Sequence, residues 1–280
     1  MIFRKYVELV KPGIIFGNGV TALAGMFLAA QGMPNYTLLF GVLVGLSLVV
    51  GSACVFNNYI DRKMDEKMVR TRNRPLVTGE ISVLAALCFA GLMGIVGEGF
   101  LLFFGTPLSA VCALMGFFVY VVPYSFLKYY SVHATLIGSI AGAIPPVVGY
   151  TALSGEFDLA ILILFTMIVL WQMPHFFAIA SYRLAEYQAA SIPVLPLKRG
   201  MYITKIQMLL YVMAFVLASV SLFFYGYAGY IYLGVSLLLG GWWVGVALQG
   251  FKCRQDGIWA RKMFLVSLIV VMGQSVAIPL

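Results

Sequence analysis

Charged residues are scarce in this chain. They make up 10% of its 280 residues, and only ten of them are Asp or Glu. A soluble globular domain usually has about 25% charged and about 45–50% apolar residues. Here 62% of the residues are hydrophobic and the mean hydropathy is +0.99. No soluble core could bury so much apolar surface, so we expect the lipid bilayer to be the solvent of this protein and no nucleic acid to be its partner.

Cysteine and histidine are also few. The four cysteines, Cys54, Cys88, Cys112 and Cys253, are scattered without a CxxC spacing or a neighbouring histidine cluster. This pattern excludes a zinc site and a disulfide framework, and it is typical of small apolar residues in helices. Residues 1–11 contain no long apolar run that ends in a cleavage motif, so no removable signal peptide is expected.

Long hydrophobic runs, in contrast, are abundant. Each is long enough to cross a bilayer, which takes about 20 mainly apolar residues. The runs cover residues 13–31, 38–58, 81–102, 107–126, 133–153, 159–179, 206–225, 229–249 and 262–279. The sequence therefore predicts an all-α integral membrane protein with about nine transmembrane helices in one bundle. We expect residues 1–280 to form a single domain, with long loops at about 59–80 and 180–205.

Basic residues are confined to alternate connections between these runs. All eighteen Lys and Arg lie in, or at the edge of, the N-terminal segment and the connections after spans two, four, six and eight. The other connections, near residues 32–37, 105–106, 155–158 and 226–229, contain none. Because positively charged loops remain in the cytoplasm, the N-terminus is predicted to be cytoplasmic and the C-terminus periplasmic.

The second predicted span runs into an acidic segment. Asn57, Asp61 and Asp65 are spaced four residues apart, so they share one face if the helix continues beyond the apolar run. Mg²⁺ is usually held by one or two carboxylates together with phosphate oxygens of a substrate, and the following Arg70 and Arg74 could hold such oxygens. The segment is either a site for Mg²⁺ and a diphosphate or a solvated loop whose Arg side chains contact lipid headgroups.

Glu186 lies in the second long loop, which is predicted on the same side of the membrane. It could supply a further oxygen ligand opposite the first acidic segment. The candidate metal ligands are therefore Asn57, Asp61, Asp65 and Glu186. The alternative is a plain connecting loop, which its two prolines would also suit.

The chain has two histidines, His175 near the inner end of span six and His133 at the start of span five. Ionisable groups at membrane depth are rare and often functional, and a histidine there could ligate a haem iron or contact a substrate. The alternative is an interfacial histidine bonded to a helix carbonyl. Pro174 is expected to break the helix beside His175, and Pro145 and Pro146 to break span five, which would open a cavity.

Five motifs, in order along nearly the whole chain, carry a resemblance to a known family. They are KPGIIFGN at 11–18, VFNNYIDR at 55–62, GAIPPVVGY at 142–150, WQMPH at 171–175 and YQAASIPVLP at 187–196. These motifs resemble those of the UbiA-type intramembrane prenyltransferases and, within that superfamily, those of the protohaem IX farnesyltransferases (haem O synthases).

The resemblance implies an enzyme that transfers the farnesyl group of farnesyl diphosphate to a vinyl group of haem B. Water is added in the same reaction, and the products are haem O and diphosphate. Mg²⁺ is the implied cofactor, whereas haem B is a substrate. The implied location is the bacterial cytoplasmic (inner) membrane, with the active site facing the cytoplasm. A terminal oxidase or a haem-handling protein is a candidate partner.

The resemblance also implies roles for residues of this chain. The catalytic residues would be the four candidate metal ligands, Asn57, Asp61, Asp65 and Glu186. The diphosphate would be bound by Arg70, Arg74, Lys11, Lys128 and Lys198. Haem would be bound by His175 or His133.

Two other functions stay open on the residues alone. A prenyltransferase that acts on an aromatic quinone precursor would need the same diphosphate site. A transporter would account for proline-kinked helices. However, its substrate groups should lie near the bilayer midplane, whereas the charged residues of this chain gather at one face.

Overall fold

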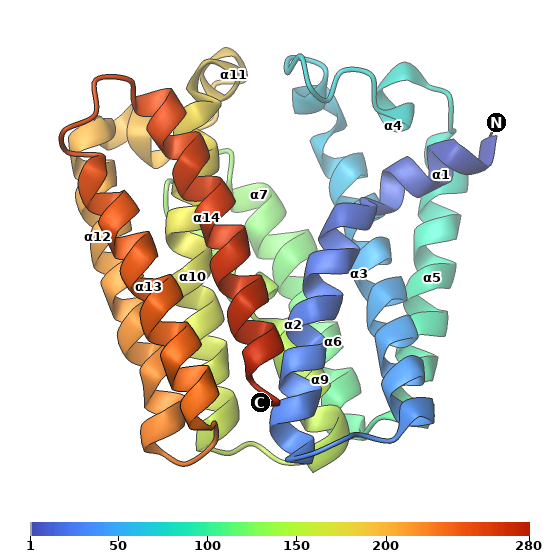
Figure 1. Ribbon diagram of the computed structural model, residues 1–280. Coiled ribbons are helices and arrows are strands. Elements are labelled where there is room, and N and C mark those ends of the chain that lie inside the picture. Colours follow the sequence, from blue (N-terminus) through green and yellow to red (C-terminus); the bar gives the residue numbers. More distant parts are fainter. Residues whose placement is uncertain (1) are drawn as a thin grey trace.

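A computed structural model describes residues 2–280, and within this range the regular structure is entirely helical (Figure 1). Nine segments are long and apolar enough to cross a membrane, as the sequence predicts. They are α2 (Pro12–Ala30), α3 (Tyr36–Asp65), α5 (Val83–Phe104), α6 (Pro107–Val119) continued through α7 (Ser125–Leu127), α8 to α9 (Ala134–Ser154), α10 (Leu159–Tyr182), α12 (Leu195–Phe224), α13 (Tyr230–Gln249) and α14 (Asp256–Ala277). The chain is thus a multi-pass membrane protein.

The connections that carry the basic residues meet at one end of the bundle, at the top of Figure 1. We call this the basic end. The short helices α1 (Ile2–Val10), α4 (Pro75–Thr78) and α11 (Leu184–Ala189) lie here. The two long loops predicted at 59–80 and 180–205 are also here, but they are partly helical. Part of the first continues α3 to Asp65, and the end of the second belongs to α12.

At the opposite end, polar side chains fix where several spans begin. The side chains of Asn35, Thr106 and Asp158 accept hydrogen bonds from backbone N–H groups in the first turns of α3, α6 and α10. The first N–H groups of a helix have no partner within the helix, so a capping side chain stabilises its start. These caps explain why the predicted and observed starts of the three spans agree within two residues.

Glycines allow pairs of spans to touch backbone to backbone. A Cβ added at Gly149 of α9 would lie 2.0 Å from a carbonyl oxygen of α2, and one at Gly25 of α2 would lie 2.1 Å from a carbonyl oxygen of α9. Gly45 of α3 and Gly97 of α5 meet in the same reciprocal way, at 2.9 and 2.8 Å. Because lipid tails are themselves apolar, the hydrophobic effect does not drive helices together in a bilayer. Close packing of small residues stabilises such bundles instead.

Two proline sites behave differently. Span five is divided at Ala143, between α8 (Ala134–Gly142) and α9 (Ile144–Ser154), so the expected break before Pro145 and Pro146 is confirmed. In contrast, α10 is continuous through Pro174, and the expected break beside His175 is wrong. Neighbouring helices can hold a proline-containing span together, and α10 packs against both α12 and α14.

Candidate active site

A cavity of about 580 Å³ lies among α2, α3, α6, α8, α10 and α14, a volume typical of small-molecule sites. Along α3 its lining runs from Leu46, deep in the span, to Asp65 at the basic end, a length of about 28 Å at 1.5 Å per residue. The deep part is mostly apolar, and the mouth at the basic end holds acidic and basic side chains. The cavity therefore suits a long apolar molecule with an anionic head.

The acidic face of α3 is formed as its spacing requires. α3 (Tyr36–Asp65) continues without interruption beyond the apolar run. Asn57, Asp61 and Asp65 all line the cavity, and their exposed fractions are only 2%, 8% and 5%. Three oxygen-bearing side chains are therefore held on one helix face at the cavity mouth.

Each carboxylate on this face already contacts a cation. Lys128 Nζ donates to Asp61 Oδ2 at 2.5 Å, and the Tyr129 hydroxyl donates to Asp61 Oδ1. Arg74 Nη1 donates to Asp65 Oδ2 at 2.6 Å. Burial lowers the pKa of Lys128, although the nearby Asp61 carboxylate opposes this change. Two cations suited to phosphate oxygens are thus held at the mouth of the cavity.

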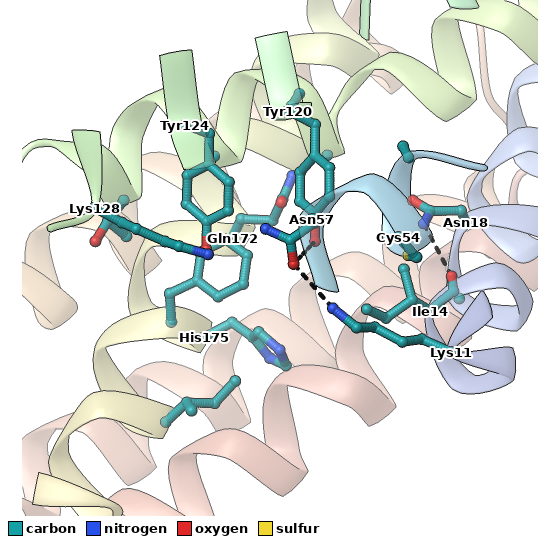
Figure 2. Close-up of a pocket in the computed structure, with 18 of the residues that line it drawn as sticks. Lys11, Ile14, Asn18, Cys54, Asn57, Tyr120, Tyr124, Lys128, Gln172 and His175 are labelled. Carbon is teal, nitrogen blue, oxygen red and sulfur yellow. Dashed lines mark hydrogen bonds between the residues drawn. The ribbon is translucent and has the colours of Figure 1, made fainter. Parts of the chain in front are cut away.

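The amide of Asn57 is surrounded by polar groups. Lys11 Nζ donates to its Oδ1 at 2.9 Å, and the Tyr120 hydroxyl approaches the same oxygen at 3.4 Å (Figure 2). Its Nδ2 donates to Ser125 Oγ at 2.9 Å. Burial lowers the pKa of Lys11 to about 8, so an anion bound beside it would favour its charged form.

Tyr120 and Tyr124 reach the cavity from a π-helical turn, η1 (Tyr120–Tyr124). Their rings stack at 5.3 Å between centroids (Figure 2), and Lys128 Nζ lies 5.3 Å from the centre of the Tyr124 ring. Single π-turns inside helices are frequent at functional sites. This turn presents both rings, followed by Lys128, to the same cavity.

His175 lines the cavity from α10 and is 9% exposed. Its Nδ1 lies 2.7 Å from Ser267 Oγ of α14, and that hydroxyl in turn donates to the Phe264 carbonyl oxygen at 2.6 Å. A serine hydroxyl has a single proton, so Ser267 must accept from Nδ1–H. Nε2 then carries the free lone pair. Trp171 stacks on the imidazole ring at 4.8 Å between centroids and fixes its plane.

Not every residue predicted for the site reaches the cavity. Arg70 lines it, but Glu186 is not among the lining residues. Its Oε1 accepts from Arg183 at 2.9 Å, and its Oε2 lies 3.8 Å from Arg70 Nε. Lys198 and His133 are exposed and also lie outside the cavity lining. Glu186 therefore lies at the rim of the mouth, where it contacts Arg70, and it does not line the cavity with Asp61 and Asp65.

The donor set is compatible with a divalent cation that arrives with a phosphorylated molecule. Among residues 2–280, no three His, Cys, Asp or Glu side chains lie close enough to hold a metal ion by themselves. The mouth instead provides two carboxylates and one amide oxygen on one helix face. Mg²⁺ commonly takes one or two carboxylates and completes its shell with water and phosphate oxygens.

Comparison with known proteins gives consistent results. A sequence model of the UbiA prenyltransferase family matches residues 18–269. The chain is 50% identical over 277 residues to the proteins named protoheme IX farnesyltransferase from Citrobacter koseri and from Escherichia coli O1:K1. Each alignment covers 99% of this chain and 94% of the relative.

Solved structures resemble the fold at low sequence identity. A structure described for digeranylgeranylglyceryl phosphate synthase matches with a TM-score of 0.82 at 17% identity, over 99% of this chain and 97% of that chain. A UbiA homolog from Archaeoglobus fulgidus, bound to DMAPP and Mg²⁺, matches with a TM-score of 0.72 at 16% identity, over 98% of both chains. These likenesses establish a shared arrangement of helices.

Proposed function

Because the chain belongs to the UbiA prenyltransferase family, we propose that it transfers the farnesyl group of farnesyl diphosphate to a vinyl group of haem B. Water is added in the reaction, and haem O and diphosphate are released. The observation that carries this proposal is 50% identity, over 99% of the chain, to relatives named protoheme IX farnesyltransferase. The cavity supports it, because an apolar body and a charged mouth suit the two ends of a prenyl diphosphate.

The diphosphate would bind at the basic end, where Lys11, Lys128, Arg70 and Arg74 line the cavity. These cations stabilise the negative charge that grows on the diphosphate as the allylic C–O bond breaks. Arg74 and Lys128, which contact Asp65 and Asp61 here, would turn to the phosphate oxygens when the diphosphate binds. Lys198 is exposed, so we expect it to contribute only to the surrounding positive field.

Mg²⁺ would be held by Asp61, Asp65 and the Asn57 amide oxygen, whose oxygens share one helix face. When bound, Mg²⁺ supplies positive charge that stabilises the leaving diphosphate. Glu186 would act from outside this set, by holding Arg70 and Arg183 at the rim. A UbiA homolog of the same fold is bound to DMAPP and Mg²⁺, which supports Mg²⁺ as the metal.

The acceptor step needs a dry cavity. The haem vinyl group would attack C1 of the farnesyl group as a π nucleophile, and the new cation would be delocalised by the porphyrin before water captures it. Water that reached C1 first would give farnesol. The apolar lining of α3 and α6, with the rings of Tyr120 and Tyr124, would keep water away from this position.

We further propose that the chain is a single domain of a bacterial cytoplasmic membrane protein, with its basic end in the cytoplasm and its C-terminus outside. The confinement of Lys and Arg to one end supports this orientation. The active site would then open toward the cytoplasm. The lipid bilayer surrounds the bundle, and a terminal oxidase or a haem-handling protein is the protein partner to test.

Mass spectrometry of haem tests the function directly. Purified protein incubated with farnesyl diphosphate, Mg²⁺ and haem B should convert haem B to haem O and release diphosphate. In parallel, 4-hydroxybenzoate replaces haem B. Prenylation of 4-hydroxybenzoate alone would assign the chain to quinone-precursor synthesis, and diphosphate uptake into vesicles without any product would indicate a transporter.

Replacing His175 by Ala should weaken haem B binding by about tenfold or more, because the variant loses the free Nε2 as an axial ligand or orienting group. A titration followed by haem absorbance measures this change. His133→Ala is the matched control, since His133 is exposed and lies outside the cavity lining. An unchanged titration in His175→Ala would rule out the ligand role.

A further inference from the structure

The face that α2 turns to the cavity contains two glycines, Gly13 and Gly17, beside the larger side chains of Ile14 and Asn18. Gly13, Gly17 and Thr21 are spaced four residues apart, and all three line the cavity. A Cβ added at Gly13 or Gly17 would meet no atom within 4 Å, and neither glycine has positive φ. In contrast, a Cβ at Gly25 of the same helix would strike a carbonyl oxygen at 2.1 Å. Neither packing nor backbone conformation requires Gly13 and Gly17.

A glycine inside a helix destabilises it relative to alanine, so these two need another explanation. They belong to the motif KPGIIFGN at 11–18, in which Lys11 binds Asn57. No other side chain of the motif is hydrogen-bonded to a residue assigned to the diphosphate site. The open space in front of both glycines suggests that the explanation is a molecule that lies in the cavity.

A second, independent observation indicates what that molecule is. His175 is 9% exposed, and its Nδ1 is held by Ser267. Its Nε2 makes no hydrogen bond within residues 2–280, although the ring lines the same cavity. Nε2 is not one of the fully enclosed side-chain atoms, so it is open to the cavity and can bind a ligand there. In Figure 2, α2 borders the cavity at Ile14 and Asn18, and His175 enters it from α10. A free imidazole nitrogen and the open space in front of two glycines therefore lie in one cavity.

We propose that the porphyrin of haem B lies flat against the backbone of α2 at Gly13 and Gly17, with its iron accessible to His175 Nε2. The two glycines are then specificity-determining residues, because they leave room for a wide planar acceptor. This inference rests on the proposed function and extends it to the choice of acceptor. A rigid macrocycle cannot bend around a projecting side chain, whereas a flexible farnesyl chain can.

The test is Gly17→Leu. Haem B binding, followed by the change in haem absorbance, should weaken at least tenfold, and haem O formation should fall in parallel. Binding of farnesyl thiolodiphosphate, an unreactive analogue, should change less than twofold. Gly17→Ala should give a smaller loss of the same kind. The matched control is Gly19→Leu, which lies two residues further on and therefore on the other side of the helix. A Cβ at Gly19 also meets no atom within 4 Å.

The outcomes separate this inference from the proposed function. If the wild-type chain binds no haem B, the proposed function and this inference both fail, and the measurement on the wild type is sufficient to show that. If the wild type makes haem O but Gly17→Leu binds haem B equally well, only the proposed porphyrin position at Gly13 and Gly17 is overturned. An equal loss in Gly19→Leu would also overturn it, because the effect would then come from the helix. An equal loss of farnesyl thiolodiphosphate binding in Gly17→Leu would overturn it as well, because the leucine would then block the whole cavity.

Discussion

Replacing Asp61 by Asn is expected to lower the rate of haem O formation by about 10²- to 10³-fold, the effect typical of removing one preorganised electrostatic group. Asp61 is 8% exposed at the cavity mouth and is the carboxylate that Lys128 and Tyr129 both contact. Asn keeps the shape and one oxygen acceptor but removes the negative charge. The site would then hold Mg²⁺ weakly and would lose the counterion that positions Lys128.

The matched control is Glu66→Gln. Glu66 follows the same helix end, but its side chain is exposed and lies outside the cavity lining. Turnover should be unchanged in this variant. Both variants should insert and unfold like the wild type, as measured by thermal unfolding in detergent. Full turnover by Asp61→Asn would show that Asp61 is not a ligand of the proposed metal site.

The second large effect concerns the bundle itself. Gly149→Ala should destabilise the folded state by about 1–3 kcal/mol, because the methyl group has no space and α2 and α9 must separate. The added Cβ would lie 2.0 Å from a carbonyl oxygen of α2. Separation of these helices would also disturb the cavity wall on α2, so haem O formation should fall together with stability.

Thermal unfolding of the purified protein measures this change. Gly241→Ala in α13 is the control, because a Cβ there meets no atom within 4 Å, and this variant should be as stable as the wild type or more stable by up to about 1 kcal/mol. Equal melting temperatures for Gly149→Ala and the wild type would mean that the reciprocal glycine contact between α2 and α9 does not limit the bundle.

The spans were predictable because lipid leaves one strong signal, a run of about 20 apolar residues. All nine predicted runs correspond to observed spans. The ends were less predictable. α3 extends to Asp65, and α12 already starts at Leu195 and is kinked at Gly200, where φ is 79°. Polar helical turns beyond the hydrophobic run carry no hydropathy signal. Helix α1 was missed for a different reason: with nine residues it is too short to span a membrane, although its apolar residues recur with a helical period.

The acidic face of the site was predictable from local spacing, but its partners were not. Lys128 is separated from Asp61 by 67 positions and Lys11 from Asn57 by 46, so only the fold shows which cation meets which oxygen. Tyr120 and Tyr124 were missed because four-residue spacing of aromatics in a span usually indicates ordinary packing. The proline between them, Pro123, was the one available signal for an irregular turn.

Ser267 could not have been found from sequence either. It acts on His175 across 92 positions, and a lone serine in a span carries no pattern. Glu186 shows the opposite case. Its place in a loop on the correct side suggested a fourth ligand, yet Arg183, three residues earlier, holds one of its oxygens. Local pairing of this kind competes with long-range ligation whenever a cation lies within one helical turn.

The pairing of Asp61 with Lys128 and of Asp65 with Arg74 has a consequence for how ligands enter. Mg²⁺ alone would have to displace two cations from buried carboxylates, and diphosphate alone would draw those cations away and leave the carboxylates unpaired. Either change exposes a charge in a poorly hydrated site, which is unfavourable. When the two arrive together, each charge exchanges one partner for another. We therefore expect the mouth to bind the preformed complex of Mg²⁺ and diphosphate in preference to either ion alone.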